Sequence, residues 1–403
     1  MNSSINSSWP FLVVLACFAS IPGEGQIVLT EQQAVEIALQ NHPSVKAALI
    51  QVQEKTILKG AAKVWEPAEF FHNIAADPDY GMFGATAFGL SQAFPGRKTT
   101  VANRLYADRQ RTLAEAGLNL TKQQLAKSVR ELYLHLGFIG SEAALYRRLD
   151  SLYQEVAAVA DKRYAAGEVA LAEKLALQDK AAQMRLALET TGHEIEFDRV
   201  VLRQLLGLSE PVSPVLQPFE RMSFSLADTA LVGNSAQSLF NRASVGVAES
   251  EQAIIQAARA PTFAGGLFVQ ALPNGIVQPG WQLALRVPLA AKGLRAGEEA
   301  SGLRVQSAGA SYQAELLRQR NDMAHLLHEQ EKYEILLGYY QARGKTLAEE
   351  LLRSAALNYR SGEISFVELT QVAEQATHIE LGYLENLFGL NLTVIELKTL
   401  TGQ

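Results

Sequence analysis

The chain has 403 residues, of which 48% are hydrophobic and 19% charged, and its formal net charge at pH 7 is -6. This balance is typical neither of a bundle of membrane helices nor of a disordered tail, and the length allows a large core. Nucleic acids and anionic membrane surfaces bind proteins with concentrated Lys and Arg, and this sequence has no basic block. Both are therefore poor candidates for its main partner.

The first 25 residues have the features of an export signal. The apolar run from Phe11 to Ile21 is too short to span a bilayer but has the length of a signal-peptide core. Small residues in Gly23-Glu24-Gly25 predict cleavage before Gln26. Lipidation is the alternative, because Val14-Leu15-Ala16-Cys17 loosely resembles a lipoprotein box. After cleavage no cysteine would remain for a disulfide, a metal site or a nucleophile.

A helix and then a β-hairpin are expected next. The stretch from Leu29 to about Val64 is rich in Ala, Gln, Glu and Leu, and Thr30 is a candidate N-cap. A hairpin is predicted over residues 67–95, with its turn at Asp77-Pro78-Asp79-Tyr80-Gly81. The second strand alternates bulky with small side chains (Phe88, Leu90 and Phe94 against Ala87, Gly89, Ser91 and Ala93). The first strand shows little alternation of apolar and polar residues, so the sequence does not predict which of its side chains lie on the apolar face.

A very long helix is predicted after the hairpin. Apolar residues follow a 4-3-4-3 spacing typical of coiled coils: Leu125, Val129, Leu132, Leu136 and Ile139, then Leu145, Leu149, Leu152, Val156 and Val159. One helix from Arg97 to Arg163 would be roughly 100 Å long, so it must pack against neighbours along its length. A tight turn is expected at Tyr164 to Glu168, and a returning helix from Val169 to about Leu205.

The second half of the chain repeats the first. The segment from Arg163 to Glu173 recurs 195 positions later, from Asn358 to Glu368, with a shared Tyr-x-x-Gly-Glu turn. A helix is expected from Leu226 to about Arg259 with Ser225 as its N-cap, followed by a hairpin over residues 261–288. That hairpin pairs Thr262 to Ala271, through Pro273-Asn274-Gly275, with a strand that alternates Trp281, Leu283, Leu285 and Val287 with smaller or polar residues.

These elements divide the chain into four parts. We expect a signal peptide over residues 1–25, a first repeat over 26–207, a linker over 208–224 with three prolines, and a second repeat over 225–403. Hairpins with one apolar face suit a transmembrane barrel, but four strands cannot close one, and open edges are not tolerated in lipid. The hairpins must therefore come together in an oligomer of two, three or four chains.

The order of these elements resembles the TolC-like outer-membrane efflux proteins, in a short form similar to heavy-metal efflux channel components. The resemblance covers Leu29 to Gly402. It rests on the repeat, the paired turns, Asn41-His42-Pro43, and the hairpin ends Gln92-Ala93-Phe94-Pro95-Gly96 and Leu285-Arg286-Val287-Pro288-Leu289. It implies a mainly α fold with a small β part, and a homotrimer whose 12-stranded outer-membrane barrel continues as a helical periplasmic tunnel.

The resemblance also implies roles for the turns. They would form a periplasmic tip that contacts a membrane-fusion adaptor through Tyr164, Gly167, Glu168, Tyr359, Gly362 and Glu363. A tunnel constriction would be lined by Glu173, Glu368 and Gln371, the last a neutral residue where the family has a further acid. The structural alternative for the glutamates is that acids at helix starts complement the helix dipole. The tyrosines would then be packing residues that fix the turns.

The implied function is passive conduction in an efflux system. A resistance-nodulation-division pump of the inner membrane would drive export through the adaptor, with heavy-metal cations as one candidate cargo. Type I secretion or drug efflux is an alternative, and a periplasmic coiled-coil scaffold without a pore is an alternative of another class. We expect no enzyme activity and no cofactor, because no catalytic constellation stands out. His325 and His328 have a helical spacing that could bind metal, but solvated helix residues explain them better.

Overall fold

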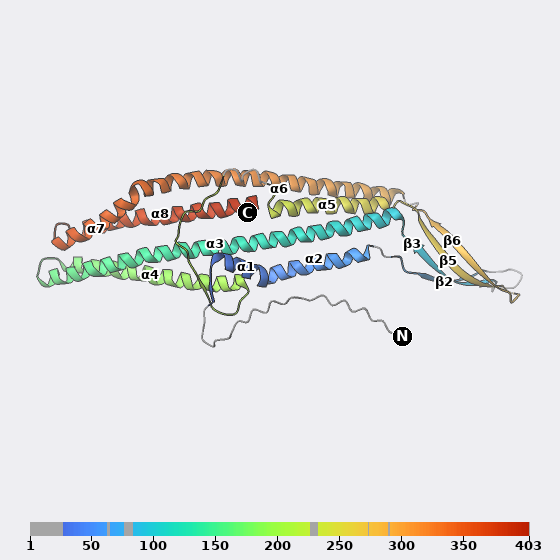
Figure 1. Cartoon of the computed structure of the whole chain (residues 1–403), viewed down its shortest axis with the longest axis horizontal. Coiled ribbons are helices and arrows are strands. Elements are labelled where there is room, and N and C mark those ends of the chain that lie inside the picture. Colours follow the sequence, from blue (N-terminus) through green and yellow to red (C-terminus); the bar gives the residue numbers. More distant parts are fainter. Residues whose placement is uncertain are drawn as a thin grey trace, which may run out of the picture.

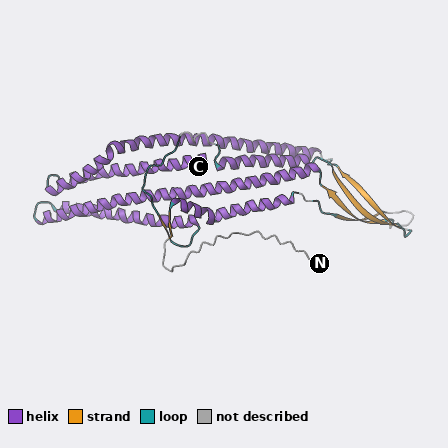
Figure 2. Cartoon of the chain, in the orientation of Figure 1, coloured by secondary structure: helices purple, strands orange, loops and turns teal. Residues whose placement is uncertain are grey.

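The computed structural model describes residues 27–62, 65–75, 84–225, 233–272, 274–288 and 291–402. The expected signal peptide, Cys17, the turn at 77–81 and the expected start of the second-half helix at Leu226 lie outside them. Within the described residues the chain is a long bundle of helices with a small sheet at one end (Figures 1 and 2). A mainly α fold with a small β part is therefore confirmed.

The first predicted helix is two helices, α1 (Glu31–Asn41) and α2 (Pro43–Ala61). Thr30 is the N-cap of α1 as predicted, in a capping box with Gln33. The prediction of one continuous helix is wrong because Pro43 has no N–H and forces His42 into an extended conformation (φ -62°, ψ 132°). Pro43 then occupies the first turn of α2, where His42 Nδ1 accepts a hydrogen bond from the Ser44 amide at 3.2 Å.

The long helix exists as predicted. Helix α3 (Arg97–Ala165) has 69 residues, and α4 (Leu171–Leu206) returns beside it. Its coiled-coil positions face the interior: Leu136, Leu145, Leu149 and Val156 are at most 1% exposed, while Leu132, Leu152 and Val159 are half-buried. Among the residues described, no helix combines the length and the apolar composition needed to cross a lipid bilayer.

The linker is fastened to the middle of the bundle. Strand β4 (Val212–Pro214) pairs in parallel with β1 (Ile27–Leu29), which precedes the first helix. The rest crosses the helices (Figure 1), where the side chain of Asn391 accepts from the Met222 amide and donates to the Glu220 carbonyl, both at 2.8 Å. Asn391 is 1% exposed, so these two hydrogen bonds satisfy a buried amide.

Within the described residues the second repeat has the same order, except that one helix instead of two precedes its hairpin and its long helix is interrupted. Its helices are α5 (Ala236–Ala257), α6 (Ala291–Tyr339), α7 (Lys345–Ser361) and α8 (Phe366–Thr401). The N-cap of α5 is Ser235, whose Oγ accepts from the Ser238 amide at 3.1 Å. Ser225 is the expected cap of a helix beginning at Leu226, which lies outside the described residues, so that cap stays a prediction. A single π-helical turn, η2 (Tyr340–Gly344), separates α6 from α7, and the corresponding helix α3 has no such interruption.

One antiparallel sheet joins the two hairpins. Its strands are β2 (Glu69–Ile74), β3 (Thr86–Phe94), β5 (Thr262–Ala271) and β6 (Val277–Arg286), in the order β2-β3-β5-β6. One hairpin per repeat is therefore confirmed, and the hairpins meet through β3 and β5. Within the chain, β2 and β6 are the edge strands.

The register assigns every strand a bulky and a small face, including the two upstream strands. On the bulky face large apolar side chains are exposed, among them Phe70 (84%), Leu283 (78%), Leu267 (73%) and Trp281 (69%). The opposite face carries small or polar residues such as Ala87, Ser91, Ala264, Gly266, Gln282 and Ala284. Two phenyl rings also lie on it, Phe71 and Phe268, each directly opposite a glycine on the next strand.

Candidate functional site

The two Tyr-x-x-Gly-Glu turns lie together at the end of the bundle farthest from the sheet (Figure 1). Each has a left-handed glycine, Gly167 (φ 76°) and Gly362 (φ 81°). The amides of Glu168 and Gly167 donate to the carbonyls of Arg163 and Tyr164, and the second turn repeats both bonds 195 positions later. Both turns are therefore Schellman motifs, and their glycines are required by the backbone.

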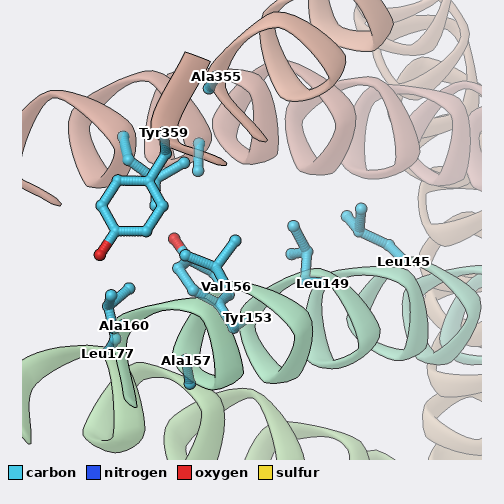
Figure 3. Close-up of a cluster of buried hydrophobic side chains, with 11 residues drawn as sticks. Leu145, Leu149, Tyr153, Val156, Ala157, Ala160, Leu177, Ala355 and Tyr359 are labelled. Atoms are coloured by element: carbon cyan, nitrogen blue, oxygen red, sulfur yellow. The ribbon is translucent and has the colours of Figure 1, made fainter. Parts of the chain in front are cut away.

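The two tyrosines of the turns differ in their surroundings. Tyr359 is fully buried, whereas Tyr164 is 39% exposed with Lys174 Nζ 5.3 Å from its ring centre. Tyr359 extends from α7 towards α3 and α4 (Figure 3). It is part of an apolar cluster drawn from four helices: Leu145, Leu149, Tyr153, Val156, Ala157, Ala160, Leu177, Ala355, Leu369 and Ala373.

Tyr359 also makes a polar contact between the repeats. Its hydroxyl donates to Glu173 Oε1 at 2.7 Å, in the first turn of α4. Burial raises the pKa of Tyr359 far above its usual value, and the hydrogen bond and negative charge of Glu173 raise it further. The hydroxyl therefore keeps its proton and remains a donor at any physiological pH. This contact connects the α7/α8 hairpin to the α3/α4 hairpin.

Arg163 is a tip residue to which the sequence analysis assigned no role. Its guanidinium donates to the Tyr359 carbonyl at 3.4 Å and lies 5.6 Å from the centre of the Tyr359 ring. It also pairs with Glu168 at 3.4 Å, so it touches both turns. The repeat offers the only sequence signal for it: Asn358 occupies the equivalent position, so the arginine is present in one turn alone.

The acidic residues fall into two groups. Glu173 and Glu368 lie in the first turns of α4 and α8, where a carboxylate complements the helix dipole. Glu168 and Glu363 precede those helices, so the dipole explanation does not apply to them. Glu363 is exposed, as is Gln371 one turn into α8.

Glu368 has a defined local function. Its carboxylate accepts from the Ser365 amide at 2.8 Å and from the Ser365 hydroxyl at 2.9 Å, which completes a capping box at the start of α8. These hydrogen bonds, from the backbone first, lower the pKa of the Glu368 carboxyl below its ordinary 4.5. The side chain is exposed and charged at neutral pH.

Further ion pairs join the hairpins away from the turns. Lys180 of α4 meets Glu374 of α8 at 2.7 Å, Arg360 of α7 pairs with Glu155 of α3, and Arg148 of α3 pairs with Glu380 of α8. Each has at least one well-exposed partner, and such pairs contribute little individually, about 0–1 kcal/mol. The buried cluster and the hydrogen bonds of Tyr359 with Glu173 and with Arg163 are therefore the specific contacts between the hairpins at this end.

Within the described ranges, no group of three or more His, Cys, Asp or Glu residues is arranged to hold a metal ion. His325 and His328 lie on α6, far along the chain from the turns. The site thus consists of hydrogen bonds, packing and exposed charges, and what such an arrangement can do is hold two helical hairpins together or release them.

The fold has close counterparts among solved structures of outer-membrane proteins. VceC from Vibrio cholerae has a TM-score of 0.76 at 18% identity, over 92% of this chain and 96% of that one. The CmeC channel of Campylobacter jejuni has a TM-score of 0.76 at 12% identity, over 92% and 85%. The MtrE channel of Neisseria gonorrhoeae, solved in its open state, has a TM-score of 0.69 at 15% identity, over 92% and 89%. No protein-family model and no curated protein sequence matches this chain.

Proposed function

We propose that this chain, which has the fold of the outer-membrane channels and so the fold expected from its TolC-like resemblance, is itself the outer-membrane duct of an efflux system. The observation that carries this proposal is the sheet. It exposes one broad apolar face, its two edge strands have no further strand partner among the described residues, and it lies beyond the ends of the helices. In lipid, such a sheet is stable only when its edges are paired in a closed barrel.

A homotrimer meets this requirement. Three copies supply twelve strands, the apolar face contacts lipid, and the small face lines the lumen. The helices, with α3 about 100 Å long at roughly 1.5 Å per residue, then extend the lumen into the periplasm as a tunnel. The scaffold alternative, in which the hairpins pack on the helices, accounts poorly for a sheet located beyond the helix ends with large apolar residues exposed.

The turns are proposed as the inner end of the tunnel. Three copies place six turns there, and Tyr164, Glu168 and Glu363 provide exposed side chains for a periplasmic adaptor. The Tyr359–Glu173 contact is proposed as a latch that holds the α7/α8 hairpin against the α3/α4 hairpin. Conduction is passive, and an inner-membrane pump of the resistance-nodulation-division type supplies the energy.

The test of the channel has two parts. The protein should fractionate with outer membranes, with the unheated sample migrating differently from the heated one in electrophoresis. Purified protein should then insert into planar bilayers and conduct ions. Recovery in the soluble periplasmic fraction, with no heat-dependent migration and no conductance, would favour the scaffold and overturn the proposal.

Glu368 offers a test of the constriction. Glu368→Gln should lower cation selectivity without unfolding the turn, because Gln at this position still completes a capping box. Glu368→Ala removes both the charge and the cap, so it also reports on helix stability. Since the pKa of Glu368 is lowered, its charge persists as the pH falls through 4.5 and is lost only below that value. The selectivity of the unsubstituted channel should follow the same pH course, and unchanged selectivity in Glu368→Gln would contradict the assignment.

The proposal for the cargo covers several classes of substrate. Heavy-metal cations are favoured by the resemblance to short-form channels, and drugs or secreted proteins are the alternatives. A strain lacking the protein should be tested for sensitivity to metal salts and to drugs in parallel, with the plasmid-borne gene as control. Sensitivity to drugs alone would overturn the metal assignment and leave the channel in place.

A further inference from the structure

The two edge strands of the sheet carry complementary charges at the same end. Arg286 is the last residue of β6, and Glu69 is the first residue of β2. Their side chains approach to 3.6 Å, and Arg286 also pairs with Glu66 at 2.9 Å. Since β2 and β6 are opposite edges of a four-stranded sheet, this contact spans the width of the sheet.

The contact lies on the small face. Glu69 is in register with Ser91, Gly266 and Gln282, and Arg286 shares the face of Gln282 because it lies four residues along the same strand. Side chains from opposite edges can meet over one face only when the sheet curves towards that face. The small face is therefore concave, as expected of the inside of a barrel.

Strand direction fixes which ends meet between copies. Three successive antiparallel pairings make β6 antiparallel to β2, so the end of β6 and the start of β2 lie at the helical end of the sheet. In a ring of copies, β6 of one copy adjoins β2 of the next. The two edge strands whose side chains touch within one chain are thus the strands that pair at every subunit junction.

We propose that Arg286 pairs across the subunit junction with Glu66 and Glu69 of a second copy of this chain. This clasp rests on the proposed trimeric channel and specifies how its edges are matched. At the helical end of each subunit junction, an arginine lies opposite two carboxylates, which favours pairing of β6 with β2. A mismatched pairing of edge strands would place like charges opposite each other and is disfavoured. The side chains are half-exposed, so the clasp provides specificity and registration more than strength.

Co-expression of two differently tagged chains tests the clasp directly. One chain carries Arg286→Cys, the other Glu69→Cys, and the outer membranes are treated with a short bis-maleimide. Because each chain has one introduced cysteine, a product that contains both tags forms only between copies. Chains with neither substitution serve as the control for cross-linking through Cys17, the only native cysteine.

A matched control uses the other end of the same strand. Gln278 lies on the same face of β6 as Arg286 but eight residues away, about 27 Å at roughly 3.4 Å per residue. Gln278→Cys paired with Glu69→Cys should give no mixed product. We expect the mixed product only from the Arg286 pair.

Charge substitutions provide a second readout. Arg286→Glu should lower the temperature at which the unheated trimer dissociates in electrophoresis, and Arg286→Lys should change it little. Combining Arg286→Glu with Glu66→Arg and Glu69→Arg should restore the original temperature. The clasp is overturned if the trimer forms normally while the cysteines at 286 and 69 cross-link only within a doubly substituted chain. Failure of the unsubstituted chain to form a trimer would instead contradict the proposed function.

Discussion

Tyr359→Phe should shift the tip towards its open state and raise single-channel conductance. The substitution keeps the buried ring in its cluster and removes only the hydroxyl that donates to Glu173. A hydrogen bond to a charged group contributes about 1.5–3 kcal/mol, and Glu173 is partly exposed, so we take the lower end. That value corresponds to a roughly tenfold change in the equilibrium between closed and open tips. Planar-bilayer recordings of the purified trimer measure it.

Tyr146→Phe is the matched control for this prediction. Tyr146 also donates to a carboxylate, Glu142 at 3.0 Å, but this partner is on its own helix α3. Removing that hydroxyl deletes the same chemical group without affecting a contact between hairpins. Glu173→Gln should have a smaller effect than Glu173→Leu, because the amide oxygen can still accept. Equal conductance of Tyr359→Phe and Tyr146→Phe would show that the contact is not a latch.

Gly280→Ala should narrow the passage at the sheet. A Cβ at position 280 would lie 2.4 Å from Cζ of Phe268, whose ring covers the glycine on the concave face. The ring must rotate away from the sheet, and in the proposed trimer it would then enter the lumen of the barrel. We expect lower conductance and a loss of stability of about 1–3 kcal/mol, as for other overpacked sites. Gly89→Ala should displace the Phe71 ring, whose Cζ would be 2.2 Å from the new Cβ, and should destabilise the sheet more, because Cβ of Phe268 would lie at 2.8 Å and cannot move by ring rotation.

Gly265→Ala is the control for this substitution. It lies on β5, and its added Cβ would be 3.5 Å from the nearest atom, a ring carbon of Phe94, which is an ordinary contact. It should conduct like the unsubstituted channel. Adding Phe268→Ala to Gly280→Ala should restore conductance, because the displaced ring is then absent. No rescue would mean that the effect of Gly280→Ala arises elsewhere.

Local patterns in the sequence were sufficient to predict most of the architecture. Two-residue alternation located β3 and β6, coiled-coil spacing located α3, and the repeated glycines located both turns. These features depend on residues close together in the chain, so they are visible before folding. Pro43 also indicates the break between α1 and α2, but the residues on both sides have a helical composition, which favoured the prediction of one continuous helix.

The long-range contacts were not predictable in the same way. Spacing shows that a helix has an apolar stripe, but not which helix covers it, and alanines such as Ala160 and Ala355 give no periodic signal of their own although they are buried at the tip. The Tyr359–Glu173 and Arg286–Glu66 contacts join residues 186 and 220 positions apart, so they exist only once the two repeats lie side by side. Ser235 could be identified as an N-cap only once it was known that α5 begins at Ala236.

The π-helical turn between α6 and α7 makes the two halves of the duplication mechanically unequal. An uninterrupted α3 behaves as a strut that transmits a displacement from one end to the other, whereas a π turn is a point at which a helix can bend. At η2, Tyr340 stacks on Tyr383 of α8 with ring centres 3.8 Å apart, and beyond the turn α7 packs on α8 through the apolar cluster around Tyr359. In a trimer, three rigid hairpins would therefore alternate with three hinged ones, and a partner that pulls on the tip would move every second hairpin.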